Sequence, residues 1–531
     1  MPKKVSNMDS YFQLPNQGLR TYLGNVVIGQ PKVWDTPFAK GESTSDLLEA
    51  WGSILVSISD QWPSLYEFEK DMASKVGPLS VRLPLQGRMA DIEAYYKGIL
   101  LPAVPVDDRA VFRVIEEWNQ SSTLRVRNQE RTIQGMRLDT NSGSPYFNSH
   151  RRDVLRDTIP CNVDIENGHA YQWLPTVHYY ACAVLGWRGQ EGGPNKADVK
   201  QRVVWMFPLA VNIRELQVYQ PLIEYAQKYK IVPAWVSNEL VDEVITKLFD
   251  TKSSNDLVVA TDFTKFDQHF NEELQKVAFA TIKARFNADL KMQDWLNGTF
   301  PIKYMIPMCY DWEKFMEGPH GMGSGSGGTN ADETLAHRAL QHEAALLKGQ
   351  VLNPNSQCLG DDGILSYPGI TVEDVVSSYT SHGLEMNSEK QYASTHDTVY
   401  LRRWHHKDYR VGNVMVGVYS TYRALGRLRY LERYMDPEIW DARAVALRQL
   451  SILENVKYHP LKEQFVDFCM KRDKYRLGID IPNFLDNIEH EAQEKIKLMP
   501  EFLGYNATLR SSAKDAYGIA NWWIVNYLKS K

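Results

Sequence analysis

Apolar and polar positions along this chain follow two different periods, which separate predicted strands from predicted helices. The β-branched run 257–261 is typical of a buried strand, and 357–365 reads as two short strands joined by a tight turn. Elsewhere apolar residues recur at helical spacing after residues that commonly begin helices. The predicted helices cover 44–58, 271–286, 331–347, 371–381 and 437–455, and two more begin at Pro460 and Pro482. The chain therefore mixes strands and helices, and it is mainly helical from about 410 onward.

Length and composition indicate a large globular protein. A chain of 531 residues, 43% of them hydrophobic, can bury a large core, and we expect several lobes rather than one domain. The chain has 60 Lys and Arg against 65 Asp and Glu, a formal net charge of −5. Its overall charge does not indicate a polyanionic partner, so any nucleic-acid site must be a local basic tunnel.

The five cysteines lie far apart and lack the spacing of a zinc site or a redox pair. We therefore expect unpaired thiols in a reducing compartment. No apolar run approaches the length that crosses a bilayer, so we expect no membrane association.

The predicted turn Gly360-Asp361-Asp362-Gly363 displays two adjacent acids at its tip. Adjacent carboxylates repel each other, and a divalent cation relieves the repulsion. Such hard oxygen ligands suit Mg²⁺ or Mn²⁺. Asp and Gly are also ordinary turn residues, so taken alone the stretch is more typical of a surface turn.

Asp262 ends the buried strand 257–261, and Asp267 follows five positions later. On a continuous strand this offset sends the two side chains to opposite faces, so a turn must follow Asp262 if both serve one site. An unpaired carboxylate at the end of a buried strand is costly, which favours a metal or another partner for Asp262. Asp267 would then lie beside the metal.

A glycine-rich loop, 321–328, runs directly into the predicted helix 331–347. Glycines allow the backbone to approach a phosphate or ribose closely, and Thr329 or Asn330 would cap the helix. The loop is not followed by the Lys that a nucleoside-triphosphatase loop requires. The βαβ pattern of a dinucleotide-binding fold is also absent. The alternative is a flexible linker.

Lys200 and Arg202 share one face of a predicted strand within 196–208, because side chains on a strand alternate. Two cations beside an apolar wall could clamp a triphosphate. A charged edge strand is an equally good interpretation.

The segment 140–146 is a loop rich in hydroxyl groups and punctuated by Gly and Pro. Its hydroxyls and backbone amides could hold a phosphate backbone without reading bases. The residues proposed for this contact are Thr140, Ser142, Gly143 and Pro145. A plain connecting loop would look the same.

Taken in order, these segments resemble a known family. Asp262-x4-Asp267, Ser324-Gly325-x3-Thr329-Asn330 and Gly360-Asp361-Asp362 resemble motifs A, B and C of viral RNA-dependent RNA polymerases. The residues within these motifs are most similar to those of the polymerases of double-stranded RNA viruses of the picobirnavirus and partitivirus type.

The resemblance implies a fold and a division of the chain. The fold would be α/β (α+β), a right-handed polymerase with an antiparallel palm sheet and mostly helical fingers and thumb. The expected parts are an N-terminal extension on the fingers and thumb (1–70), fingers (71–256, with 271–315 partly returning to them), palm (257–409), and thumb with C-terminal tail (410–531).

The resemblance also implies roles for the residues. Asp262 and Asp361, with Asp362 assisting, would coordinate two Mg²⁺ ions, or Mn²⁺, that activate the 3′-hydroxyl and stabilise the leaving pyrophosphate. Asp267 and Asn330 would test the ribose 2′-hydroxyl, which separates RNA from DNA precursors. Lys200, Arg202, Ser324, Gly325 and Thr329 would contact the nucleotide, and the 140–145 loop the template. Lys390 would be a general acid for pyrophosphate.

One departure concerns motif B. Many relatives from positive-strand viruses carry Asn four residues after the motif B Thr, whereas this chain has Glu333 there. Whether Glu333 or Asn330 completes the ribose contact stays open at this point.

The resulting hypothesis is an enzyme that copies RNA from ribonucleoside triphosphates. Its partners would be template and nascent RNA and a viral capsid protein, and it would act as a monomer in the host cytoplasm and inside the virion. A reverse transcriptase is the nearest enzymatic alternative. Such enzymes, however, typically carry an aromatic residue at the position where this chain has Leu359. A non-catalytic RNA-binding or capsid-associated protein would not need three ordered acidic motifs.

Overall fold

The computed structural model describes residues 1–5, 7–496 and 513–531, and their strands form four sheets. The sheet with the acidic motifs is antiparallel, in the order β10-β11-β7-β12. Its strands are β7 Val258–Thr261, β10 Gln357–Leu359, β11 Asp362–Leu365 and β12 Tyr392–Ser394. The predicted strand 257–261 and the predicted hairpin at 357–365 are both confirmed.

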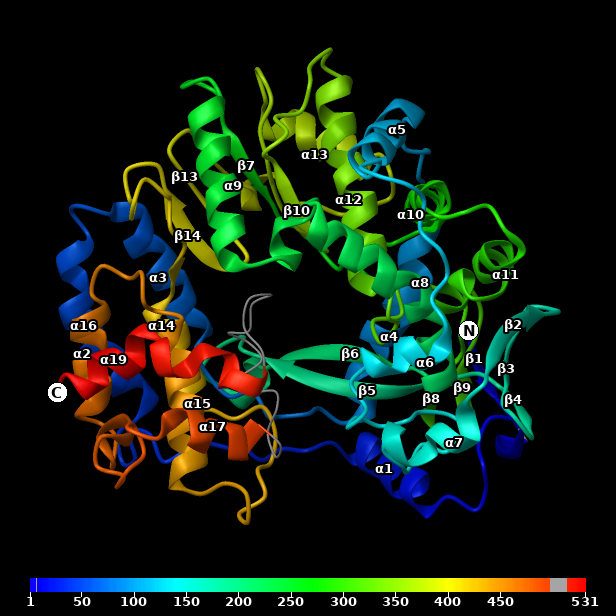
Figure 1. The fold of residues 1–531 in the computed structure, drawn as a ribbon, viewed down its shortest axis with the longest axis horizontal. Helices are drawn as coiled ribbons and strands as arrows, with labels where there is room; N and C mark the ends of the chain where they lie inside the picture. The colour runs from blue at the N-terminus through cyan, green and yellow to red at the C-terminus, as the bar shows by residue number, and fades with distance from the viewer. Residues whose placement is uncertain (6, 497–512) are drawn as a thin grey trace.

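The largest sheet has the order β1-β9-β8-β5-β6, and two smaller sheets are β13-β14-β15 and β2-β3-β4. Their bounds are β1 Pro2–Lys4, β2 Asn162–Glu166, β3 His169–Trp173, β4 His178–Tyr180, β5 Ala183–Gln190, β6 Lys200–Met206, β8 Met308–Asp311, β9 Lys314–Met316, β13 Asp397–Tyr400, β14 Arg403–His406 and β15 Val418–Tyr419. Figure 1 shows the long β5–β6 hairpin reaching from this sheet toward the helices at the C-terminal side of the molecule.

Helices surround these sheets. Their bounds are α1 Gln17–Ile28, α2 Thr44–Leu55, α3 Pro63–Lys75, α4 Met89–Lys97, α5 Asp108–Glu117, α6 Gln129–Gln134, α7 Leu155–Thr158, α8 Leu209–Lys228, α9 Asn238–Thr251, α10 Glu272–Arg285, α11 Leu290–Gly298, α12 Thr329–Leu346, α13 Val372–Thr380, α14 Thr421–Arg429, α15 Ala442–Glu454, α16 Lys462–Met470, α17 Ile488–Ile496 and α19 Trp523–Lys529. None of these helices is both long enough and apolar enough to cross a membrane.

The core that supports the acidic sheet is built around α12. Its apolar residues, among them Leu335 and Ala339, are buried with Val259 of β7 and Leu365 of β11. The same cluster takes in α5, α8 and α10, which pack around α12 (Figure 1). The sheet is therefore backed by a buried helix that carries the glycine-rich loop at its N-terminus.

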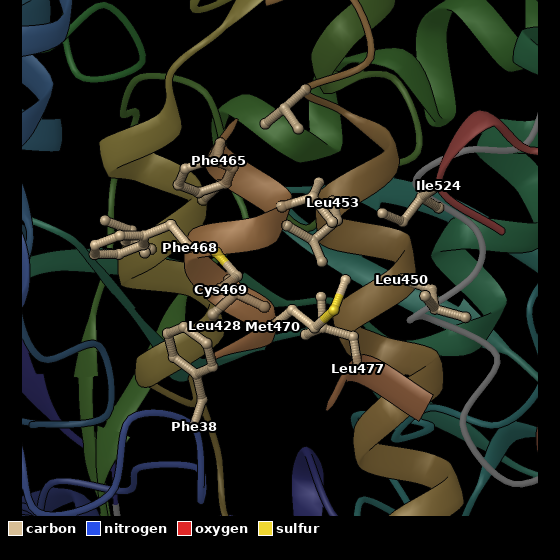
Figure 2. Packing of buried hydrophobic residues seen from close by; sticks show 14 of the residues in the cluster. Phe38, Leu428, Leu450, Leu453, Phe465, Phe468, Cys469, Met470, Leu477 and Ile524 are labelled. Carbon is tan, nitrogen blue, oxygen red and sulfur yellow. The ribbon is translucent and has the colours of Figure 1, made fainter. Parts of the chain in front are cut away.

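A second core joins the C-terminal helices to residues near the N-terminus. Figure 2 shows Phe38 among Leu428 of α14, Leu450 of α15 and Phe468 of α16, and Ile524 of α19 lies in the same cluster. These side chains are 0–5% exposed. Burial on this scale holds residues 38–68 and the C-terminal helices as one body.

The helices that the sequence predicted are present, although some begin at other residues, and further helices such as α8 and α9 were not predicted. Ser43 caps α2, as expected, and its hydroxyl accepts a hydrogen bond from the Asp46 N–H (3.1 Å). The helix predicted from 437 begins only at Ala442, because Asp441, not Asp436, caps it. The helices expected at Pro460 and Pro482 begin at Lys462 and Ile488, after turns. All five cysteines are buried and unpaired.

Candidate active site

Two acidic segments meet at one end of the β10-β11-β7-β12 sheet. β7 and β11 are antiparallel neighbours, and Thr261 pairs with Gly363. The strands run in opposite directions, so the residue after Thr261 lies across from the residues before Gly363. This register brings Asp262 next to Asp361 and Asp362. A bend and turn follow Asp262, as the sequence requires if Asp262 and Asp267 serve one site.

The turn between β10 and β11 is held from behind by α12. Strand pairing leaves Gly360 and Asp361 as the two turn residues, and Gly360 has φ 58°, a conformation that favours glycine. The Gly360 N–H donates to Thr334 Oγ1 (2.9 Å), and the Gly360 carbonyl accepts from His337 Nδ1 (2.8 Å). Burial lowers the pKa of His337 to about 4, so its ring is neutral. These contacts fix where the Asp361 carboxylate is presented.

Charge accumulates around Asp262. Restricted access to solvent and then the negative charge of Asp361 raise the pKa of Asp262, while the cations of Lys200 and Lys390 oppose that rise. Although its carboxyl group is partly desolvated, Asp262 still reaches solvent, and so does Asp361. The main chain of Asp262 is held by Gln391, whose side chain accepts from its N–H (2.7 Å) and donates to its carbonyl (2.9 Å).

Asp362 faces a different environment. Its Oδ2 accepts a hydrogen bond from the Leu401 N–H (2.8 Å). Burial, aided by the charge of Asp361, raises the pKa of Asp362 to about 7 even though the Leu401 bond and Arg402 oppose this. Asp361 is therefore the more available oxygen donor of the two.

The carboxylates of the site fit a hard divalent cation whose remaining ligands come from its substrate. Among the described residues, no three His, Cys, Asp or Glu side chains converge into a preformed metal cluster. Mg²⁺ is commonly held by one or two carboxylates together with substrate phosphates and water. Asp262 and Asp361 supply two such carboxylates, and their mutual repulsion favours a cation between them.

Asp267 pairs with Glu333 of α12. The two carboxyl groups are hydrogen-bonded to each other, and burial raises the pKa of both. Glu333 is 5% exposed, and burial of two neighbouring carboxyl groups disfavours the state in which both are charged. Asn330 Oδ1 instead accepts from Trp235 Nε1 (2.8 Å). The structure thus places Glu333, and not Asn330, against Asp267.

The glycine-rich loop packs against β6. Ser324 Oγ donates to the Val203 carbonyl (3.3 Å). A Cβ on Gly325 would lie 1.5 Å from the Trp205 carbonyl oxygen, so only glycine fits that approach. Lys303 and Asp332 form a wholly buried ion pair (3.0 Å) under the first turn of α12.

The expected cap of α12 is wrong. The helix begins at Thr329, its N-cap is Gly328, and no side chain caps it. Thr329 Oγ1 instead donates to the carbonyls of Gly323 and Ser326 (3.2 Å each), which closes the loop on itself. Asn330 is already inside the helix.

Lys200 and Arg202 project from the same face of β6, as predicted. Partial burial and Arg202 lower the pKa of Lys200, whereas Asp262 and Asp361 raise it, so Lys200 lies close to the acids. The Arg202 guanidinium donates to Gln190 Oε1 (2.8 and 2.5 Å). β6 is an edge strand, as the alternative interpretation supposed, but its charges face the acidic site.

A cavity of about 550 Å³ separates the β5–β6 hairpin from α14 and α15. Its lining contains seven arginines and one carboxylate, that of Glu432. Glu191, in the loop between β5 and β6, pairs with Arg402, Arg423 and Arg427 (3.3, 3.0 and 3.6 Å). The hairpin therefore reaches α14, and the cavity beside it is strongly cationic.

The 140–145 loop is mostly turned inward. Ser142, Gly143 and Pro145 are buried, and Thr140 Oγ1 is also shielded from solvent. Asn141 is the exposed member of the loop. Contact with template would thus use Asn141 or the backbone more readily than the expected hydroxyls. Lys390 is exposed in a short turn near Asp262.

Comparison with known proteins identifies the family. The model of the viral RNA-dependent RNA polymerase family matches residues 107–466, which include all the acids described above. The chain belongs to the viral RNA-dependent RNA polymerases. It is also 58% identical over 525 residues to a protein of human picobirnavirus named as a potential RNA-dependent RNA polymerase, with 98% of each chain covered.

Solved structures support the assignment of the chain to this family. The crystal structure of the RNA-dependent RNA polymerase of a human picobirnavirus is 56% identical, with a TM-score of 0.94, and its insertion-loop deletion mutant is 55% identical, with a TM-score of 0.93. Each comparison covers 99% of this chain and 100% of the other. The expected right-handed polymerase fold is confirmed.

Several residues of the polymerase site escaped sequence reasoning. Gln391 and the Leu401 backbone orient the acids, and neither belongs to a recognisable motif. Arg402, which lines the cationic cavity, also belongs to no such motif. Only their partners reveal these residues, and those partners depend on the folded chain.

Proposed function

We propose that the enzyme replicates and transcribes the genome of a double-stranded RNA virus by two-metal-ion nucleotidyl transfer. The observation that carries the proposal is the meeting of Asp262 and Asp361, almost a hundred residues apart, beside Lys200. The names of its picobirnavirus relatives support the viral context. Neither a reverse transcriptase nor a non-catalytic protein is needed to explain the site.

Each group has a task in this proposal. Bound Mg²⁺ or Mn²⁺ would activate the attacking 3′-hydroxyl and neutralise charge on the leaving pyrophosphate. Asp262 and Asp361 would hold the ions, with Asp362 in a supporting role. Lys200 and Arg202 would orient the triphosphate as it passes from the cationic cavity, and Lys390 would protonate pyrophosphate. Ser324, Gly325, Thr329 and Asn330 would shape the nucleotide site.

The wider biological setting is part of the same proposal. Template and nascent RNA, ribonucleoside triphosphates and a capsid protein would be the partners of a monomeric enzyme in the host cytoplasm and the virion. The template would pass the 140–145 loop. We also retain the division into extension (1–70), fingers (71–256), palm (257–409) and thumb (410–531).

The proposal is tested by incubating the full chain with a heterologous single-stranded RNA and the four ribonucleoside triphosphates, without primer. We expect labelled nucleotide in template-length product with Mg²⁺ or Mn²⁺ and none with EDTA. Parallel reactions with deoxynucleotides separate the enzyme from a reverse transcriptase. Absence of ribonucleotide incorporation on RNA with and without a primer, in the presence of either metal, would refute the proposal.

Replacing Asp267 with Ala should relax discrimination against deoxynucleotides. The Asp267–Glu333 pair lies beside the acids, and losing a hydrogen-bonding partner for the 2′-hydroxyl typically removes about 1–3 kcal/mol of preference. The measurement is the ratio of kcat/KM for a ribonucleotide to that for its deoxy counterpart. Asp108→Asn, an exposed change on α5, is the control, and an unchanged ratio in Asp267→Ala would exclude the ribose-sensing role.

A further inference from the structure

Arg88 carries a fully buried guanidinium that, among the described residues, no carboxylate pairs with directly. Its side chain is 0% exposed, and its Nε and Nη1 have no hydrogen-bond partner. Burial lowers the pKa of Arg88 to about 10, so the side chain keeps its charge at neutral pH. Neither it nor the neighbouring Arg82 forms an ion pair with any described residue. The negative charge of Asp91 offsets only part of the cost of burying this cation, and retention of a buried charge that forms no ion pair indicates a role beyond packing.

The donors that Arg88 does use go to the β5–β6 hairpin. Nη2 donates to the carbonyl of Arg202 in β6 (3.0 Å) and, at the limit of hydrogen bonding, to that of Gly186 in β5 (3.5 Å). Arg88 thus bridges both strands of the hairpin. One of its two anchors is the main chain of the residue proposed to hold the triphosphate.

Two neighbours grip the hairpin in the same way. Tyr22 Oη donates to the Leu185 carbonyl (2.7 Å), and Arg82 Nη1 donates to the Trp187 carbonyl (2.6 Å). Arg82 and Arg88 also lie 5.3 and 5.2 Å from the centre of the Trp187 ring. Aromatic contacts of this kind lower the cost of holding a desolvated cation.

The hairpin's own cations face the cavity. Arg188 and Arg202 are directly opposite each other in the β5–β6 register, and both line the cationic cavity. Like charges in such a pair are destabilising. Arg82 and Arg88 add two more positive charges behind them. The repulsion among these cations destabilises the hairpin by itself, and a bound polyanion relieves the repulsion.

We propose that Arg88, with Arg82, is a positioning residue for the substrate triphosphate. It fixes the main chain beneath Arg202 and strengthens the positive potential of the hairpin. The inference rests on the proposed triphosphate role of Lys200 and Arg202. It adds a group that does not touch the nucleotide and acts through the hairpin.

The test measures binding of sodium tripolyphosphate to the full chain by calorimetry, in parallel with kinetics for ribonucleoside triphosphates. Arg88→Gln keeps hydrogen-bond donors but removes the charge, and we expect roughly tenfold weaker tripolyphosphate binding. KM for nucleotides should rise by a similar factor while kcat changes little. Arg88→Lys, which restores the charge, should recover most of the affinity.

Arg285 supplies a matched control. It is 3% exposed, donates to the carbonyls of Trp118 and Ser121 (2.7 and 2.8 Å), and lies 4.7 Å from the Tyr225 ring centre. Arg285→Gln should lower the melting temperature but leave tripolyphosphate affinity unchanged. A purely structural role for Arg88 predicts the same behaviour for both variants.

The outcomes separate this inference from the proposed function. If the double variant Lys200→Met/Arg202→Met loses affinity but Arg88→Gln binds tripolyphosphate like the unaltered chain, the inference is overturned and the proposed function stands. If the double variant binds normally, the hairpin does not hold triphosphate, and the inference fails together with the triphosphate role of Lys200 and Arg202, while nucleotide incorporation separately tests the proposed function. Should Arg88→Gln not fold, Arg82→Gln carries the test, and unchanged affinity in it overturns the inference.

Discussion

Asp361→Asn should abolish nucleotide incorporation while leaving the fold intact. The substitution removes a carboxylate charge where Asp262 and Asp361 meet, and loss of a metal ligand costs several kcal/mol of transition-state stabilisation, about a thousandfold in rate. The Asp361 side chain is exposed at the turn, so the melting temperature and RNA affinity should stay near those of the unaltered chain. The measurement is incorporation of labelled ribonucleotide, with circular dichroism and RNA-binding assays alongside.

Asp108→Asn on α5 controls for loss of a surface charge, and Asp362→Asn provides a graded comparison. Asp362 accepts a hydrogen bond from the Leu401 N–H, which the Oδ1 of Asn can also accept, so Asp362→Asn should reduce activity less than Asp361→Asn does. Activity above a tenth of the original in Asp361→Asn would contradict the assignment of this residue as the main ligand.

Lys303→Met should cause the largest loss of stability among single changes around the site. The substitution leaves Asp332 buried at 0% exposure without its cation, and breaking a buried ion pair costs about 3–5 kcal/mol. Asp332 keeps two hydroxyl donors, Tyr219 and Tyr304 (2.6 Å each), which hydrogen-bond the carboxylate but do not neutralise it. The measurement is thermal and denaturant unfolding followed by circular dichroism.

Adding Asp332→Asn to Lys303→Met should recover part of the lost stability, because the orphaned charge is removed. Lys348→Met is the control: its ion pair with Asp374 is largely solvent-exposed, so its loss should cost about 1 kcal/mol or less. Equal destabilisation by the two single changes would mean that the buried pair contributes no more than a surface pair. Activity should fall with stability, since Asp332 lies in the first turn of the helix that holds the Gly360 turn.

The local sequence is enough to locate several elements of the site. Periodicity located β7, the β10–β11 hairpin and α12, because a buried strand and a buried helix carry different apolar spacing. The helix predicted from 437 begins later, since Asp436 and Asp441 are equally good caps in sequence and only packing selects Asp441. The three acidic motifs and their order were enough to indicate the family.

Other features depend on neighbours far apart in sequence. Sequence order does not say that β7 lies between β11 and β12, and this strand order is what brings Asp262 to Asp361. The Leu401 N–H separates Asp362 from Asp361, the burial of Glu333 pairs it with Asp267, and the inward turn of the 140–145 loop hides its hydroxyls. Each outcome is set by the partners and the solvent access of a polar group.

The sequence by itself thus determined where the acidic motifs stand, where β7, the β10–β11 hairpin and α12 form, and to which family the chain belongs. The tertiary structure decided which acids meet and that Asp362 accepts from a backbone N–H. It also buries Arg88 beneath Arg202, where it forms no ion pair with any residue the structure describes. The physical reason is that the energy of a charged group depends on the dielectric and the donors around it. Long-range packing fixes both.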